Sequence, residues 1–392
     1  MTQIPDLKEQ ISRLISQPSV SSVNPLFDQG NAKVTDLLAS WLAELGFEIE
    51  IQTLPGQPDK SNLIATLGKG PGGLVLAGHT DTVPFDEGRW KHDPFKLTEA
   101  DQRFYGLGTS DMKAFLAIAI EAARSFTAKQ LTAPLMILAT ADEESSMGGA
   151  KLLVESQRPQ ADYAVIGEPT GMRPIRMHKG IMMESIRLIG QSGHSSDPSL
   201  GNNALEAMHR VITDLMTWRR ELQSDYHNPL FSVPTPTMNF GHIHGGDNPN
   251  RICADCELQI DLRPLPGMDI VELRQILHAR LQGLFQDSPI TLDFQPLFEG
   301  TPAMETSATS PIVQATEKLT GYAAGAVAFG TEGPYFNQMG MNTVIMGPGD
   351  IDQAHQPDEF LALDRIQPTV EILKKLINHF CVGNTVAKDH LP

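Results

Sequence analysis

The chain has 392 residues, of which 41% are hydrophobic, and this length predicts two folded domains. It carries 47 acidic and 30 basic residues, a formal net charge of -17, and has no cluster of lysine and arginine, which argues against nucleic acid as a partner. No apolar run approaches the roughly 20 residues that span a bilayer, and residues 1–6 lack the basic and apolar regions of a signal peptide, so we expect a soluble cytoplasmic protein.

Helical and strand patterns alternate up to about residue 170, beginning with a helix over residues 36–45 and a strand over 47–53. Between the later strands, a helix is expected over residues 112–126, and Gly148 opens another. Apolar runs without polar alternation indicate strands covered on both faces, over residues 74–77, 135–139 and 163–166. The pattern predicts an α/β fold with a mostly parallel sheet and flanking helices.

The pattern changes after Gly171 to the order β-α-β-β-α-β. The expected elements are a strand over 181–189, a helix over 204–222, strands over 235–242 and 252–262, a helix over 269–285 and a strand over 290–295. This order is typical of the ferredoxin-like α+β unit. We therefore predict that residues 178–297 form a domain inserted into a larger one made of residues 1–177 and 298–392.

The three cysteines, Cys253, Cys256 and Cys381, are odd in number and lack the spacing of a disulfide framework. Cys253 and Cys256 form a C-x-x-C, but the second pair or the thioredoxin-like context that a zinc or redox site needs is missing. We interpret them as ordinary strand residues.

Short acidic and histidine-bearing segments follow the predicted strands, and another lies far downstream. They are His79-Thr80-Asp81, Asp111-Met112-Lys113, Asp142-Glu143-Glu144, Gly167-Glu168-Pro169 and Ala354-His355-Gln356-Pro357. Open α/β sheets place their ligand crevice at the carboxyl ends of strands. Histidine and carboxylate are also the ligands of hydrolytic divalent metals, so the segments indicate a metal site.

Each segment alone has a simpler explanation. His79 and Asp81 fit a strand-end histidine with a capping aspartate, or a metal ligand whose second ring nitrogen donates to Asp81. Asp111 fits a helix N-cap. His355, in a loop rich in Gly and Pro, fits a surface histidine.

The acidic residues after the buried strands are harder to dismiss. Glu143 and Glu144 could begin a solvated helix, but adjacent carboxylates also point in different directions, so one can bind metal while the other takes a proton from water. Glu168 ends an apolar strand, where a lone carboxylate is costly unless it is paired or liganded.

The order and wording of these segments resemble the M20 family of co-catalytic zinc hydrolases over essentially the whole chain. The resemblance is carried by residues 76–84, 105–108, 139–144, 166–170, 190–198 and 354–359. It implies a metallopeptidase-like catalytic domain. Asp111 would bridge two divalent metals, one also bound by His79 and Glu168 and the other by Glu144 and His355.

The resemblance also implies roles outside the metal ligands. Asp81 would orient His79, and Glu143 would be the general base that activates a water and later protonates the departing amine. The peptide bond between Asp111 and Met112 would be cis. Zinc, cobalt and manganese all accept such ligands, so the native metal stays open between them.

Three further residues are candidates for substrate choice. His194, in a glycine-flanked loop, is a solvent-facing residue on simple grounds, but in similar enzymes it reaches the partner subunit's active site and stabilises the oxyanion. Arg251 is either a surface base or the fork that binds a substrate carboxylate. Glu332 is either an exposed loop residue or the partner of a substrate ammonium group.

The activity implied is hydrolysis of the acetyl amide of N2-acetyl-L-ornithine in arginine biosynthesis. Related amidohydrolases remain alternatives: a succinyl-diaminopimelate desuccinylase, an N-acyl amino acid acylase or a dipeptidase. A metal-binding or amino-acid-binding protein without catalysis is a rival from another class, which the presence of Glu143 argues against. The resemblance also implies a homodimer formed through the inserted domain, which would act as a lid.

Overall fold

The computed structural model describes residues 4–382 and divides the chain into two compact units. The first contains the described residues up to Arg176, Thr306–Gly325 and the described residues from Thr331 on. The second contains Met177–Glu305 and Ala326–Gly330, so it includes the predicted insertion, 178–297, and extends beyond it. The structure does not describe residues 1–3 or 383–392. The first range is part of the segment in which we looked for a signal peptide, and the second is part of the predicted larger domain.

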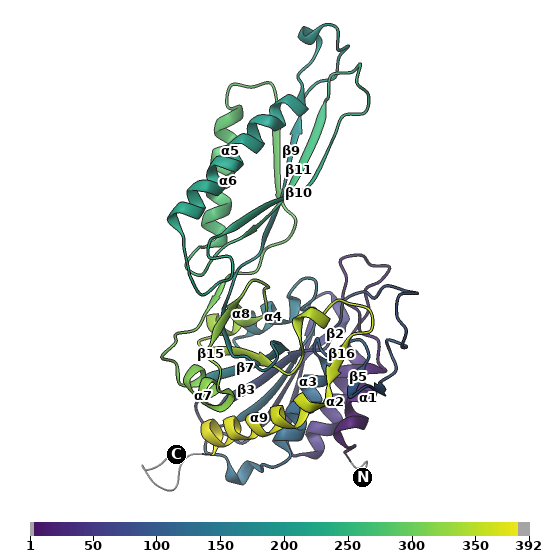
Figure 1. The fold of residues 1–392 in the computed structure, drawn as a ribbon, viewed down its shortest axis with the longest axis vertical. Coiled ribbons are helices and arrows are strands. Elements are labelled where there is room, and N and C mark those ends of the chain that lie inside the picture. Colours follow the sequence, from purple (N-terminus) through teal and green to yellow (C-terminus); the bar gives the residue numbers. More distant parts are fainter. Residues whose placement is uncertain (1–3, 383–392) are drawn as a thin grey trace. The chain divides into compact units, whose positions relative to one another are not determined.

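The first unit is built around a sheet whose central strands are parallel (Figure 1). The parallel strands are, in spatial order, β6 (Leu135–Thr140), β3 (Leu74–His79), β7 (Tyr163–Pro169) and β15 (Asn342–Gly347). Antiparallel strands flank them: β2 (Gln57–Leu67) beside β6, with β1 (Glu48–Leu54) outside β2, and β8 (Ile175–His178) beside β15. The prediction of a mostly parallel α/β sheet is confirmed.

Short strands and helices complete the first unit, and β13 of the second unit also pairs with its large sheet. A small sheet contains β4 (Thr98–Ala100), β5 (Arg103–Tyr105) and β16 (Phe360–Ala362), while β13 (Met304–Glu305) and β14 (Gly325–Val327) pair with β8. The helices are α1 (Leu7–Ile15), α2 (Ala32–Glu44), α3 (Lys113–Ala123), α4 (Gly148–Ser156), α7 (Pro311–Thr320), α8 (Gly333–Gln338) and α9 (Ile366–Cys381). In Figure 1, α4 and α8 lie on one side of the large sheet and α3 and α9 on the other.

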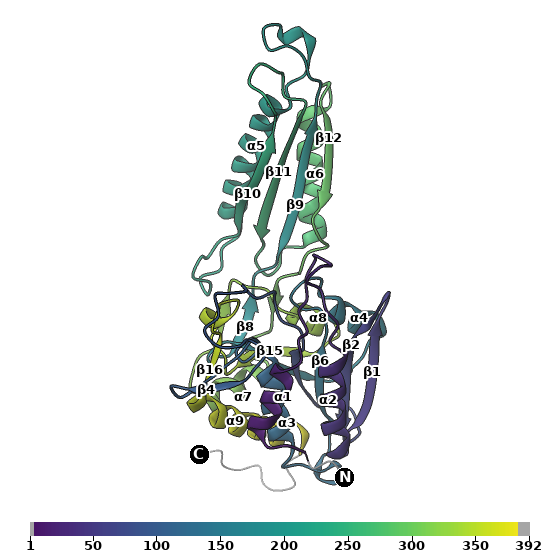
Figure 2. The same ribbon diagram turned by 90° about the vertical axis from the view of Figure 1, so that its right-hand side faces the viewer.

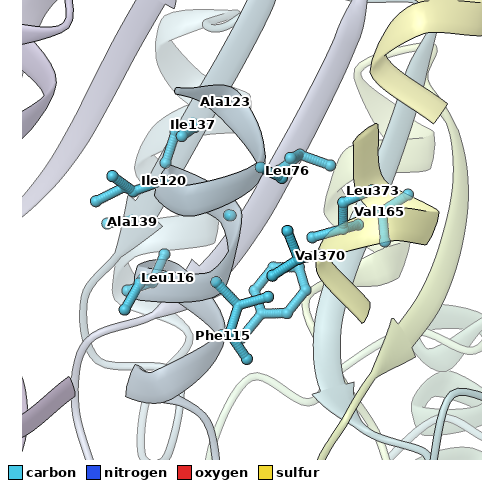
Figure 3. Packing of buried hydrophobic residues seen from close by; sticks show 14 of the residues in the cluster. Leu76, Phe115, Leu116, Ile120, Ala123, Ile137, Ala139, Val165, Val370 and Leu373 are labelled. Carbon is cyan, nitrogen blue, oxygen red and sulfur yellow. The ribbon is translucent and has the colours of Figure 1, made fainter. Parts of the chain in front are cut away.

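Helix α3 is apolar on nearly all sides because other elements surround it. It packs on β3 of the sheet and against α1 and α9. In Figure 3, Phe115 of α3 lies on the side of Val370 and Leu373 of α9, and Leu116 lies on the other side of the helix. Gly167 of β7 leaves room for the aromatic ring, since a Cβ there would lie 2.1 Å from Cγ of Phe115. The core thus holds α3 against the strands that carry the acidic segments.

The second unit has an antiparallel sheet with two helices on one face (Figure 2). Its chain order is β9 (Met182–Ile189), α5 (Ala204–Asp225), β10 (Thr237–Gly245), β11 (Asp255–Arg263), α6 (Ile270–Phe285) and β12 (Thr291–Pro296). The strands lie in the order β10-β11-β9-β12, and burial alternates along β9 and β11 because the helices cover one face. The predicted ferredoxin-like arrangement is confirmed.

The positions of the cysteines and the length of β2 differ from what the sequence predicted. The cysteines are free and buried; Cys256 lies in β11 and Cys253 just before it, so only Cys256 is a strand residue. The 11-residue strand β2 was not expected, because Lys60, Ser61 and Asn62 are buried polar residues inside it.

Within residues 4–382, no helix is both long and apolar enough to cross a membrane.

Candidate metal centre

Parallel strands bring the predicted site residues to one edge of the sheet. His79 is the last residue of β3, and Glu168 lies near the end of β7. Because Ala77 pairs with Ile166 in these parallel strands, His79 and Glu168 stand at the same level two residues further on. Glu143 and Glu144 follow β6, the neighbour of β3 on its other side.

The two nitrogens of His79 have different partners. Nδ1 lies 2.9 Å from the backbone carbonyl oxygen of Asp81 and 3.7 Å from its carboxylate. A carbonyl accepts only a donated proton, so Nδ1 carries a hydrogen. Nε2 lies 3.1 Å from Oδ1 of Asp111 and 3.9 Å from Oε1 of Glu168. Nε2 is therefore the nitrogen that faces the carboxylates and would bind a metal once it has lost its proton.

Asp81 contacts His79 differently from the prediction. We expected its carboxylate to accept the ring proton, but the backbone carbonyl is the nearer acceptor. The carboxylate instead accepts a hydrogen bond of 3.0 Å from the backbone N–H of Glu144. Asp81 thus joins the loop after β3 to the loop after β6.

His355 lies beside the other carboxylates. Its Nε2 is 3.1 Å and 3.2 Å from the two oxygens of Glu144 and 3.5 Å from Oδ2 of Asp111. Since Oδ1 of Asp111 faces His79, the two oxygens of this one carboxylate face different imidazoles. The side chain of His355 is 53% exposed, so one side of the group is open to solvent.

The N-cap explanation for Asp111 is wrong. Helix α3 begins at Lys113, and its N-cap is Met112. The Asp111 carboxylate points to the histidines instead of capping the helix. The predicted cis peptide bond between Asp111 and Met112 is confirmed.

The centre concentrates buried negative charge. Burial, and then the charge of a neighbouring carboxylate, raises the pKa of Glu143, Glu144 and Glu168 above its ordinary value. Burial also acts on Asp111, but its hydrogen bond and charge contact with His79 lower the pKa of Asp111 on balance. The hydrogen bond that His355 donates to Glu144 raises the pKa of His355 to about 9.

These residues fit divalent cations. Ligand atoms of His79, Glu143 and Glu168 lie within 4.8 Å of one another, as do those of His79, Asp111 and Glu144. Oε1 of Glu168 is buried and has no hydrogen-bond partner among the residues that the structure describes. Imidazole with several carboxylates is a donor set suited to zinc and similar metals, and a cation would offset the repulsion between the acids.

Glu359 is a site residue that the sequence analysis missed. Its buried carboxylate accepts hydrogen bonds from the backbone N–H groups of Ser110 at 2.7 Å, Asp111 at 3.0 Å and Gly108 at 3.1 Å. It thereby holds the loop that presents Asp111. The only signal was its position in the segment that also contains His355.

Glu332 is a buried carboxylate in the first unit, which excludes the exposed-loop alternative. It is 0% exposed, and Oε2 accepts a hydrogen bond of 2.8 Å from the hydroxyl of Thr140. Its Oε1 lacks a hydrogen-bond partner within residues 4–382, and burial raises the pKa of Glu332 to about 7. Thr140 pairs with His79 in the neighbouring strands β6 and β3, so Glu332 lies close to the centre.

His194 and Arg251 lie side by side in the second unit, joined by an isolated antiparallel bridge. Nδ1 of His194 accepts a hydrogen bond from the backbone N–H of Ser196 at 3.2 Å. The guanidinium of Arg251 forms an ion pair of 2.5 Å with Asp247, and both side chains of that pair are exposed. The sequence singled out both residues separately, and the fold places them together.

Comparison with known proteins identifies the class. The model of Peptidase family M20/M25/M40 matches residues 75–379, so the chain belongs to this family of hydrolases. A relative from Pasteurella multocida (strain Pm70), acetylornithine deacetylase, is 51% identical over 383 residues, which cover 98% of this chain and 100% of the relative.

Solved structures share the fold. Aminopeptidase PepT from Bacillus cereus has a TM-score of 0.75 at 19% identity, covering 95% of this chain and 97% of that one. A Bacillus subtilis protein described as a dinuclear metal binding peptidase of the M20 family has a TM-score of 0.66 at 16% identity, covering 95% and 97%. The fold that the sequence predicted is therefore the fold of this family.

Proposed function

We propose that the protein hydrolyses the acetyl amide of N2-acetyl-L-ornithine, giving L-ornithine and acetate, a step of arginine biosynthesis. The 51% identical relative over nearly the whole chain supports the substrate. The observation that carries the reaction class is Asp111, whose two carboxylate oxygens face His79 and His355 while Glu143 is buried in the same centre.

We assign the ligands of two divalent cations, zinc in this proposal, with cobalt or manganese as substitutes. Asp111 would be shared, His79 and Glu168 would hold one ion, and Glu144 and His355 the other. When bound, the ions polarise the amide carbonyl and make a water more acidic.

Glu143 serves as the general base in this proposal. Its carboxylate lies near the ligands yet is 8% exposed, and its pKa is raised first by burial and then by the charge of Glu168. A carboxylate with a raised pKa is a better proton acceptor near neutral pH. Glu143 would take a proton from the attacking water and pass it to the departing α-amine. Asp81 would keep His79 in its ligand tautomer through the backbone carbonyl.

Three residues are proposed to recognise the substrate. The planar fork of Arg251 suits the α-carboxylate of the substrate, which would have to displace Asp247. His194, beside Arg251, would stabilise the oxyanion in the active site of the partner subunit. Glu332 is proposed to meet the δ-ammonium group; because it is fully buried, direct contact would require its surroundings to open.

A homodimer in the cytoplasm completes the proposal. The sheet of the second unit ends at β10, and an edge strand can pair with another chain. Ile243 in β10 is an exposed apolar residue at this edge. Light scattering at working concentration tests the dimer, and cell fractionation tests the location.

One assay tests the function. Metal-free protein is reconstituted with zinc, cobalt or manganese and offered N2-acetyl-L-ornithine, N2-succinyl-L-ornithine, succinyl-diaminopimelate, acetyl-methionine and a dipeptide, with and without chelator. We expect the first substrate to have the highest kcat/KM and the chelator to abolish turnover. Preference for another substrate would assign a different amidohydrolase, and binding without turnover would assign a binding protein.

A further inference from the structure

The turn that carries Glu143 and Glu144 begins with an unusual backbone at Asp142. Asp142 has φ 64°, in the left-handed region, and it follows directly on the loop that leaves β6. Aspartate is one of the few residues besides glycine that enter this region readily. The backbone carbonyl of Asp142 accepts hydrogen bonds from the N–H groups of Ser146 at 3.3 Å and Met147 at 2.8 Å, which close the turn around the two glutamates.

The side chain of Asp142 fixes this turn to the rest of the first unit. Its Oδ1 lies 2.5 Å from Nζ of Lys60 and accepts hydrogen bonds from the hydroxyls of Ser21 at 2.6 Å and Ser145 at 3.1 Å. Oδ2 accepts a hydrogen bond from the hydroxyl of Ser146. None of these partners is a proposed metal ligand, so the Asp142 side chain has a set of contacts of its own.

Lys60 is the least expected member of this group. It lies within β2 and is 6% exposed, and its ammonium also forms an ion pair of 2.7 Å with Asp28. A buried ion pair is a poor source of stability, because desolvation offsets most of the attraction between the charges. Its better attested use is to fix one arrangement of the chain among several.

We infer that Lys60 and Asp142 are positioning residues that hold the general base Glu143 in its catalytic place. The inference rests on the proposed role of Glu143. One peptide bond joins Asp142 to Glu143, so release of the Asp142 carboxylate allows the turn to rotate and moves the base. A misplacement of about 1 Å can lower turnover by about 100-fold.

The test compares Lys60→Met with Lys60→Arg, which keeps the charge, and with Lys8→Met, which removes the exposed ion pair between Lys8 and Glu99. For Lys60→Met we expect kcat to fall about 30- to 100-fold with little change in KM. Metal content by atomic emission should stay at the wild-type level. Lys60→Arg should recover most of the turnover, and Lys8→Met should keep all of it.

A second readout is independent of turnover. Crystal structures of metal-free wild type and Lys60→Met should show the Glu143 carboxylate displaced by more than roughly 0.5 Å. A carboxylate that stays in place, or a kcat within about twofold of wild type, would overturn the inference. Loss of metal from Lys60→Met would also overturn the inference, since Lys60 and Asp142 would then be needed to position the metal ligand Glu144. If Lys60→Met does not fold, the isosteric Asp142→Asn takes the same measurements.

These readouts separate two failures. If wild-type protein turns over none of the amides, the proposed function fails, whereas the displacement of Glu143 can still be measured. If wild type is active and Lys60→Met keeps both its turnover and the position of Glu143, only the positioning role fails.

Discussion

Replacement of Glu143 by glutamine separates the chemistry of this side chain from its structural effect. Glutamine has nearly the same shape, so at a position that is 8% exposed it leaves no cavity, but its amide cannot accept the proton. A general base contributes about 10²- to 10⁴-fold to turnover. We therefore expect kcat to fall by up to about 10⁴-fold, or about 5.5 kcal/mol in the activation barrier, with metal content unchanged.

The same substitution should stabilise the metal-free protein. Burial and then the charge of Glu168 raise the pKa of Glu143 in the folded state. A folded pKa above the unfolded value means that stability falls as pH rises from about 4.5 through the folded pKa. Glutamine removes this loss, so metal-free Glu143→Gln should have a higher Tm than wild type at pH 8, while at pH 4 the two should differ little.

Turnover is measured with N2-acetyl-L-ornithine at matched metal loading, and Tm by circular dichroism in excess chelator. The reasoning about the base would be refuted by a kcat within tenfold of wild type. The reasoning about buried charge would be refuted by a metal-free variant that is less stable than wild type at pH 8.

Three further substitutions test other parts of the protein. His194→Ala should lower kcat strongly with metal content unchanged, and a near-normal kcat would remove its oxyanion role. Glu332→Gln should weaken the preference for acetylornithine over an uncharged acetyl amino acid. The pKa of Glu332 rises from 4.5 to about 7 on folding. The substitution should therefore also stabilise the metal-free protein, by about 3 kcal/mol above pH 7 and by little below pH 4.5. Unchanged preference in this variant excludes the substrate contact, and an unchanged urea midpoint at pH 8 contradicts the burial argument. Gly167→Ala places a Cβ 2.1 Å from Phe115 and should cost about 1–3 kcal/mol in urea unfolding, whereas Gly283→Ala, where nothing lies within 4 Å, should not destabilise the protein.

The sequence was most informative where local pattern and burial agree. The apolar runs of β3, β6 and β7 predicted buried parallel strands, and the acidic and histidine segments after them indicated the site. The order of strands and helices after Gly171 predicted the ferredoxin-like unit because each element there has its own clear periodicity.

Pattern reading failed where a buried polar residue finds its partner far along the chain. Strand β2 was missed because Lys60 and Asn62 look like loop residues, yet Lys60 meets Asp142, and the Asn62 amide donates to the carbonyl of Gly149. The N-cap reading of Asp111 failed for a related reason, since a local rule for helix starts cannot foresee two distant histidines.

By itself, then, the sequence determined the class of fold and the types of ligand, because these follow from side-chain periodicity and from residues that stand next to strand ends. Only the tertiary structure decided how the site is held together. It placed the two oxygens of Asp111 between His79 and His355 and buried Glu332 against Thr140. It also brought Glu359 to the loop that carries Asp111, where its carboxylate accepts a backbone hydrogen bond. These contacts join residues 32 to 248 positions apart, and at such separations local periodicity carries no information about which side chains meet.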